Sequence, residues 1–127
     1  MKIILLLTGG ALGTLTRFLV SGFSQNIYLG AFPLGTLLVN LAGSFIIGLL
    51  WGIFEFATIS SSVRTFIFVG ILGGFTTFSS YALETLNLFR DGDIKLAVIN
   101  VMANNILGIG LAVAGFLLAR YIMGVVK

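Results

Sequence analysis

Four long stretches that carry almost no charge constrain this chain more than any other feature. Leu34–Phe54, Thr65–Leu83 and Leu96–Ala119 contain no Asp, Glu, Lys or Arg, and Ile3–Ser24 contains only Arg17. A bilayer core of about 30 Å is crossed by roughly 20 predominantly apolar residues of helix. Because 58% of the residues are hydrophobic and only 9% are charged, we expect a membrane protein rather than a soluble domain.

The predicted fold class is all-α, with four transmembrane helices in one domain covering residues 1–127. The spans are predicted at about 3–24, 34–54, 64–88 and 95–122. The only proline, Pro33, and a turn with Gly92 between two aspartates mark two of the boundaries. We therefore expect a multi-pass protein of the cell (plasma or inner) membrane that has the lipid bilayer as a partner.

The composition also narrows the chemistry. The chain has no cysteine and no histidine, which excludes disulfides, thiol chemistry, imidazole catalysis and the usual transition-metal ligands. The basic residues lie at segment ends rather than in a run or patch, so nucleic-acid binding is not expected. We expect no enzyme activity.

The basic residues divide almost evenly between the two sides that four crossings define. The side of the termini and second loop holds Lys2, Arg64, Arg120 and Lys127, and the other side holds Arg17, Arg90 and Lys95. Such a small bias leaves two alternatives under the positive-inside rule. Either the chain inserts in both orientations and can form an antiparallel dimer, or the small asymmetry fixes one orientation.

Small residues recur at four-residue spacing, as in the pairs Gly9 and Gly13, Gly48 and Gly52, Gly70 and Gly74, and Gly110 and Ala114. Such spacing lets helices approach closely in lipid, where apolar burial gives no drive to associate. The contacts lie either inside one subunit or at a subunit interface.

Polar residues at bilayer depth must find a partner or face water. Two helical stripes carry them, formed by Thr36, Asn40 and Ser44 on the second span and by Asn100 and Asn104, followed by Gly108, on the fourth. Asn105 falls off the second stripe. The stripes either hold helices together or line a pathway. Because they offer mostly hydrogen-bond donors and no central carboxylate, a pathway would suit a small anion better than a cation.

The stretch GGFTTFSSY, Gly73 to Tyr81, predicts that the third span breaks near mid-membrane. Two glycines weaken the helix, and the β-branched Thr76 and Thr77 do not restore it. Unwound backbone at that depth is tolerated only inside protein or beside a cavity, where its carbonyls can coordinate a cation. Physical reasoning alone leaves a packing kink or an ion site.

Phenyl rings recur every three residues in the same stretch, at Phe75, Phe78 and Tyr81. This spacing is typical of a lipid-facing or packing stripe. Their positive ring edges can also face an anion.

Three motifs resemble the Fluc (CrcB) fluoride channels of bacteria and other microbes. They are GGALGTLTRF at residues 9–18, GTLLVNLAGSFIIG at 35–48 and GGFTTFSSYALE at 73–84. The resemblance implies a fluoride-selective channel that exports fluoride passively from the cytoplasm and relieves fluoride toxicity. It also implies an antiparallel dual-topology homodimer with two pores, in which the partner is a second copy of the chain. No nucleotide-binding loop or central carboxylate indicates an energy source.

The resemblance also assigns residues. A structural Na⁺ at the dimer interface would be held by the main-chain carbonyls of Gly73 and Thr76. Arg17 would supply positive potential near the pore, and Glu84 closes the third motif. The fluoride pore would be lined by Asn40, Phe78, Ser79, Ser80, Tyr81, Asn100 and Asn104. Most of these positions match the family's pattern, which favours a competent homodimer over a member of a heterodimeric pair.

One departure from the family pattern is Tyr81, which stands where phenylalanine is commoner. Tyrosine keeps the ring edge and adds a hydroxyl, which either donates to an anion or obstructs a pore.

Two other functions compete with this one. A small multidrug-resistance-type proton-coupled exporter also has four spans, but it needs a carboxylate in its first span, and Ile3–Ser24 contains none. A purely structural membrane subunit would leave the polar stripes as contacts between helices.

Overall fold

The computed structural model of the chain describes residues 1–125, and every regular element in that range is a helix. Four helical segments are long and apolar enough to cross a membrane, namely Lys2–Ile27, Leu34–Phe54, Ser61–Arg90 and Ile94–Gly124. The prediction of an all-α protein with four membrane-spanning segments is confirmed for this part of the chain. Lys127, counted above among the basic residues, lies outside it.

The first two segments are each one helix, α1 (Lys2–Ile27) and α2 (Leu34–Phe54). The third and fourth are subdivided. The third consists of α3 (Ser61–Arg64), η1 (Thr65–Leu72), α4 (Gly73–Phe75) and α5 (Phe78–Arg90). The fourth consists of α6 (Ile94–Met102), η2 (Ala103–Leu107) and α7 (Gly108–Val125). The stretches η1 and η2 are π-helical, with hydrogen bonds that reach five residues along the chain and therefore a wider turn.

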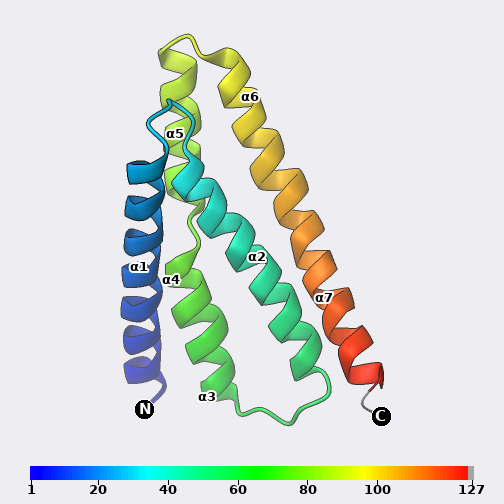
Figure 1. Cartoon of the computed structure of the whole chain (residues 1–127). Coiled ribbons are helices and arrows are strands. Elements are labelled where there is room, and N and C mark those ends of the chain that lie inside the picture. Colours follow the sequence, from blue (N-terminus) through cyan, green and yellow to red (C-terminus); the bar gives the residue numbers. More distant parts are fainter. Residues whose placement is uncertain (126–127) are drawn as a thin grey trace.

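The chain runs up and down, so that its two ends lie at the same end of the molecule (Figure 1). The turn between α5 and α6 contains Gly92, whose φ of 85° is a conformation that glycine adopts without a steric penalty. This is the turn that the sequence predicts between Asp91 and Asp93.

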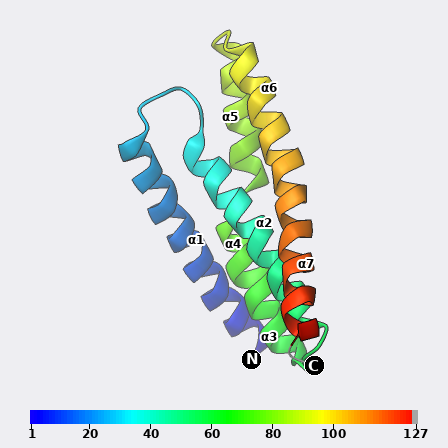
Figure 2. The ribbon, with the colours of Figure 1, turned by 45° about the vertical axis from the view of Figure 1, so that its right-hand side comes forward.

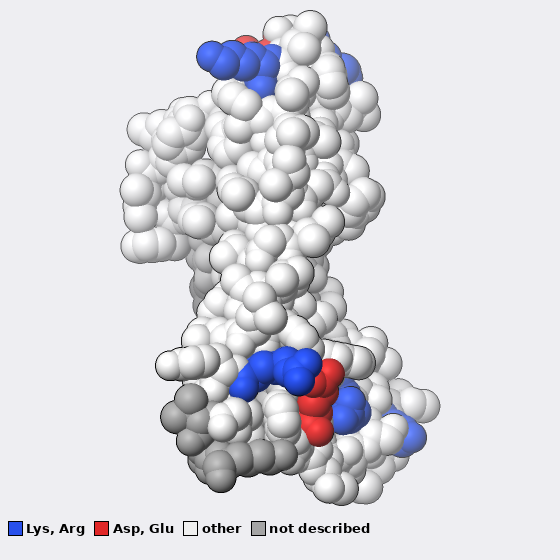
Figure 3. Space-filling model, turned by 90° about the vertical axis from the view of Figure 1, so that its right-hand side faces the viewer, with Lys and Arg blue, Asp and Glu red and all other residues white. Residues whose placement is uncertain are grey.

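Charged side chains gather near the two ends of the molecule on the face shown in Figure 3, and the band between them is uncharged. Large apolar side chains point outward from the helices, among them Phe18, Ile109 and Leu117, which are 73%, 67% and 59% exposed. A soluble protein rarely exposes so much contiguous apolar surface. The surface therefore fits a multi-pass membrane protein.

Glycines bring two pairs of helices into close contact, α1 with η1 and α4, and α2 with α7 (Figure 2). A Cβ added at Gly9 would lie 2.7 Å from the carbonyl oxygen of Phe66, and one at Gly74 would lie 2.7 Å from that of Gly10. At Gly48 an added Cβ would overlap the carbonyl of Ala112. These glycines therefore serve packing within one chain, whereas Gly110 has no atom within 4 Å of such a Cβ.

The third segment is interrupted between α4 and α5, where Figure 1 shows an extended link. Thr76 has φ −82° and ψ 158°, and Thr77 has φ −150° and ψ 115°, so both residues are extended. Thr77 caps α5, because its Oγ1 accepts the N–H of Ser80 at 3.2 Å. The interruption falls within the GGFTTFSSY stretch, directly after its two glycines and Phe75.

Candidate functional site

A cavity of about 330 Å³ lies beside this interruption, between α2, η1, α4, α5 and η2. It is lined by apolar and aromatic side chains and by a set of uncharged polar residues from three separate segments. The polar residues are Asn40, Ser44, Thr76, Thr77, Asn104 and Asn105. No Asp, Glu, Lys or Arg is among the described residues that line it.

The side-chain amide of Asn40 replaces part of the helical hydrogen bonding at the interruption. Its Oδ1 accepts the N–H of Thr77 at 2.8 Å, and its Nδ2 donates to the carbonyl of Thr77 at 3.0 Å. In an unbroken α-helix the N–H of Thr77 would donate to the carbonyl of Gly73. Because Asn40 takes that donor, the extended backbone is satisfied and the Gly73 carbonyl is released.

A chain of side-chain hydrogen bonds leads away from Asn40. Its Nδ2 also donates to Oδ1 of Asn104 at 2.9 Å, and Nδ2 of Asn104 donates to Oδ1 of Asn100 at 2.9 Å. Nδ2 of Asn100 donates to Oγ1 of Thr85 at 2.9 Å, which donates to the carbonyl of Tyr81 at 2.8 Å. Asn104 lines the cavity, whereas Asn100 is fully buried behind it and supports Asn104.

The two polar stripes predicted from sequence face each other in part. Asn40 and Ser44 line the cavity opposite Asn104, and a Cβ added at Gly108 would lie 3.6 Å from Oγ of Ser44. Thr36 belongs to the same stripe of α2 but lies at a different cavity.

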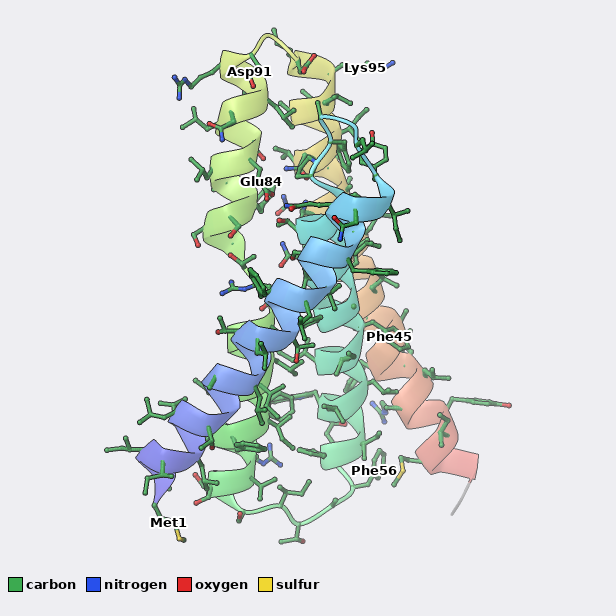
Figure 4. The ribbon with its side chains drawn as sticks, turned by 60° about the vertical axis from the view of Figure 1, so that its left-hand side comes forward. Met1, Phe45, Phe56, Glu84, Asp91 and Lys95 are labelled. Atoms are coloured by element: carbon green, nitrogen blue, oxygen red, sulfur yellow. The ribbon has the colours of Figure 1, made fainter. Side chains whose placement is uncertain are left out.

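That second cavity, of about 200 Å³, lies beside the turn between α1 and α2 and contains Thr36 and Glu84. Oγ1 of Thr36 donates to Oε1 of Glu84 at 2.6 Å, and Figure 4 shows Glu84 on α5 facing the space toward α2. The other carboxyl oxygen, Oε2, is buried without a hydrogen-bond partner among the described residues.

Phe78 and Tyr81 meet edge to face in the wall of the cavity. Their ring centroids are 5.2 Å apart at an interplanar angle of 68°. Tyr81 is buried, whereas Phe78 is 75% exposed on the single chain. Phe75 is buried but does not line this cavity, because the interruption after it breaks the helical spacing. The three-residue aromatic stripe is therefore not one continuous face.

Of the remaining predicted site residues, some line the cavity and others do not. Gly73 and Thr76 both line the cavity. Ser80 lies just outside it and accepts a hydrogen bond from Oγ1 of Thr77 at 3.0 Å, and Oγ of Ser79 lies 3.4 Å from the same oxygen. Arg17 lies in the body of α1, half-buried, and is not among the lining residues.

Sequence reasoning missed two residues of this site. Thr77 was expected only to weaken the helix. Its backbone N–H instead donates to Asn40, and its side chain caps α5. The signal for it was a threonine directly before the first residue of a helix, because threonine is a preferred N-cap residue. Asn105 was expected to lie off the polar stripe, yet its Nδ2 donates to the hydroxyl of Tyr81 at 3.1 Å and it lines the cavity. The wider turn of η2 brings Asn104 and Asn105 to the same cavity.

Comparison of the sequence with known proteins places this chain in a family. The family model described as "CrcB-like protein, Camphor Resistance (CrcB)" matches residues 4–116. A curated relative from Parabacteroides distasonis, named "Fluoride-specific ion channel FluC", is 46% identical over 126 residues, which cover 99% of this chain and 98% of the relative.

Further relatives carry the same name. The one from Maridesulfovibrio salexigens is 38% identical over 123 residues, covering 96% of this chain and 98% of its own length. The one from Thermococcus kodakarensis is 44% identical over 45 residues, covering 35% of this chain and 37% of its own length. The resemblance carried by the three sequence motifs is therefore confirmed, and the chain belongs to the CrcB family.

Proposed function

We propose that this protein is a fluoride-selective ion channel of the cell inner membrane that lets fluoride leave the cytoplasm passively and so relieves fluoride toxicity. The observation that carries the proposal is the match over 99% of the chain to a relative named as a fluoride-specific ion channel. The residues that line the cavity between α2, α5 and η2 have the chemistry that suits this function.

The cavity offers fluoride a hydroxyl donor and positive ring edges. Fluoride in an apolar pore without such groups would lose its hydration at a prohibitive cost. The amides of Asn40 and Asn104 lie in the wall, but both N–H groups of each already donate within the protein. The hydroxyl of Tyr81 also lines the cavity, and the edges of Phe78 and Tyr81 carry the positive part of their quadrupoles. Because no carboxylate lines the described cavity, it favours an anion over a cation.

A second, antiparallel copy of the chain completes the pore in this proposal. Phe78 is 75% exposed although it forms part of a polar cavity wall, and a partner subunit would cover it. When Arg17, which lies in the body of α1, is counted with the far side, the basic residues divide four to three between the two sides, and so small a bias permits both insertion orientations. A two-fold related pair of chains then contains two equivalent pores.

The residues at the interruption fit a structural Na⁺ at the centre of that dimer. Gly73 and Thr76 both line the cavity, and the carbonyl of Gly73 is released from its helical partner because Thr77 donates to Asn40. Backbone carbonyls at a helix break are ligands that Na⁺ accepts in membrane proteins. When bound, the ion would supply a fixed positive charge close to the anion path.

Supporting roles are proposed for the other residues that the family resemblance assigns. Ser79 and Ser80 extend the donors beyond Phe78, and Asn100 holds Asn104 in place. Arg17 adds positive potential from α1. Glu84, held by Thr36, lies at the second cavity at the far end of the α2 stripe.

The experiment that tests the proposal is fluoride efflux from liposomes that contain the purified protein. Valinomycin and a potassium gradient balance charge, a fluoride electrode reports release, and chloride in the same buffer serves as the comparator. We expect rapid fluoride release that protein-free liposomes lack and little chloride release. Absence of fluoride release, or equal chloride release, would overturn the proposal.

A further inference from the structure

The contacts of Asn105 determine the direction of its hydrogen bond to Tyr81. Nδ2 of Asn105 lies 2.8 Å from the carbonyl oxygen of Val101 and 3.1 Å from the hydroxyl oxygen of Tyr81. A backbone carbonyl only accepts, so the amide atom that faces Val101 must be the NH₂ group. The second N–H of the same group therefore donates to the Tyr81 hydroxyl.

Because the hydroxyl oxygen of Tyr81 accepts from Asn105, its own proton is free to be donated elsewhere. Asn105 is the only hydrogen-bond partner of this hydroxyl among residues 1–125. The Tyr81 side chain is only 8% exposed, whereas Asn105 is exposed. Tyr81 and Asn105 both line the 330 Å³ cavity, and that cavity is the space open to the proton.

We propose that Tyr81 and Asn105 form a donor pair that binds a small, strongly hydrogen-bond-accepting anion in the cavity. Asn105 acts as the positioning residue by occupying the acceptor side of the hydroxyl, and Tyr81 supplies the O–H donor. The pair rests on the proposed function, because that function identifies the anion as fluoride. A phenylalanine at position 81 would offer only its ring edge, so the pair adds an anion contact that phenylalanine cannot make.

The proposal predicts how the substitution Asn105→Asp changes anion binding. A carboxylate at this position only accepts, so it would take the Tyr81 proton, reverse the hydrogen bond and withdraw the donor from the cavity. Asn105→Asp is therefore expected to weaken anion binding as Tyr81→Phe does. Hydrogen bonds to charged groups are worth enough to raise the half-saturating fluoride concentration by roughly tenfold or more.

The test uses purified full-length protein in which Tyr28 and Tyr121, both exposed, are replaced by phenylalanine. Tyr81 is then the only tyrosine in the chain. Sodium fluoride is titrated against ultraviolet difference absorbance, with sodium chloride at equal concentration as the comparator. Asn87→Asp, on the exposed side of α5 and away from the cavity, is the matched control for the added charge.

We expect fluoride, and not chloride, to produce a saturable shift of the Tyr81 absorbance to longer wavelength. Asn105→Asp should abolish the shift, and Asn87→Asp should leave it unchanged. A shift that is absent, equal with chloride, or unaffected by Asn105→Asp overturns the donor pair. Liposome flux separates the two proposals, because fluoride release without the shift overturns the pair alone, whereas no release from wild-type protein overturns the proposed function.

Discussion

At the residue scale, the site depends on side-chain amides that form hydrogen bonds with the backbone and with other side chains at the same time. Asn40 makes three hydrogen bonds, two to the extended Thr77 and one to Asn104. It therefore couples the interruption of the third segment to the fourth segment through one side chain. An amide serves here because it both donates and accepts, which neither a carboxylate nor an aliphatic side chain does.

Asn40→Asp is expected to reduce fluoride release sharply. The carboxylate cannot donate to the Thr77 carbonyl or to Asn104, and it places a negative charge in the cavity wall. In the liposome assay we expect a loss of roughly tenfold or more, since each lost buried hydrogen bond costs about 1 kcal/mol and one order of magnitude is about 1.4 kcal/mol. Asn87→Asp serves again as the control, and near-normal release by Asn40→Asp would show that the cavity is not the pathway.

Phe78→Ile is expected to reduce fluoride release while the protein still assembles. Isoleucine keeps an apolar side chain of similar size but removes the ring edge that meets Tyr81. Release rate and elution volume on size-exclusion chromatography measure the two effects separately. Phe89→Ile, at an exposed position near the end of α5, is the matched control. Equal release by both variants would remove Phe78 from the pathway.

Thr36→Val tests the half-buried carboxyl group of Glu84, whose Oε2 is buried. The valine is close in shape to threonine but cannot donate, so both oxygens of Glu84 would be left without a partner. Such a group costs about 1–3 kcal/mol, and we expect a lower midpoint of thermal unfolding in detergent. Thr8→Val is the control, because Thr8 is exposed and bonds only its own helix backbone. An unchanged midpoint for Thr36→Val would mean that the hydrogen bond adds no stability.

At the element scale, glycines and π-helical turns decide how the segments fit. The close approach of α2 and α7 requires the absence of a side chain at Gly48 and Gly115, where an added Cβ would overlap backbone carbonyls. In lipid this packing replaces the hydrophobic drive that brings helices together in water. The π-helical turn η2 then changes which residues of the fourth segment reach the cavity.

Gly48→Ala and Gly110→Ala should have opposite effects on stability. The alanine methyl group at position 48 would overlap the carbonyl of Ala112, and overpacking of this kind costs about 1–3 kcal/mol. At position 110 nothing lies within 4 Å, and alanine favours the helix by up to about 1 kcal/mol. Thermal unfolding of the two variants in detergent measures the difference. Equal midpoints would contradict the assigned packing of α2 against α7.

At the scale of the whole molecule, the distribution of charge bears on orientation. Charged residues lie near both ends, with an uncharged band between them on the face in Figure 3. The termini share one end, and the turn between α5 and α6 lies at the other (Figure 1). With Arg17 counted on the far side, the difference in basic residues between the two sides is small, and under the positive-inside rule it leaves both a single and a dual orientation open.

Single cysteines at Lys2 and Lys95 test the orientation, because the chain has no cysteine of its own. Lys2 lies at the end of the molecule that holds the termini, and Lys95 lies near the α5–α6 turn at the other end (Figure 4). If the chain inserts both ways, a membrane-impermeant thiol reagent applied to intact cells should label about half of each variant. Labelling of one position only would establish a single orientation and contradict the antiparallel dimer.

The sequence by itself determined the class of fold and indicated the stretch, Gly73 to Tyr81, in which the extended residues Thr76 and Thr77 lie. Long apolar runs must be helical in a bilayer, because no water satisfies their backbone groups. The weak helix propensity after Gly73 is likewise a local property. Motifs along the chain were also enough to indicate the family.

Only the tertiary structure decided which polar residues share a cavity. Asn40 and Thr77 are 37 residues apart, and their hydrogen bonds depend on how α2 packs beside the interruption. Asn105 lies off the predicted stripe, yet within the π-helical turn η2 it donates to the hydroxyl of Tyr81. Asn100 lies on the predicted stripe but is buried behind Asn104. Helical spacing gives the face of an isolated helix, whereas packing and local changes of helical turn determine what that face contacts.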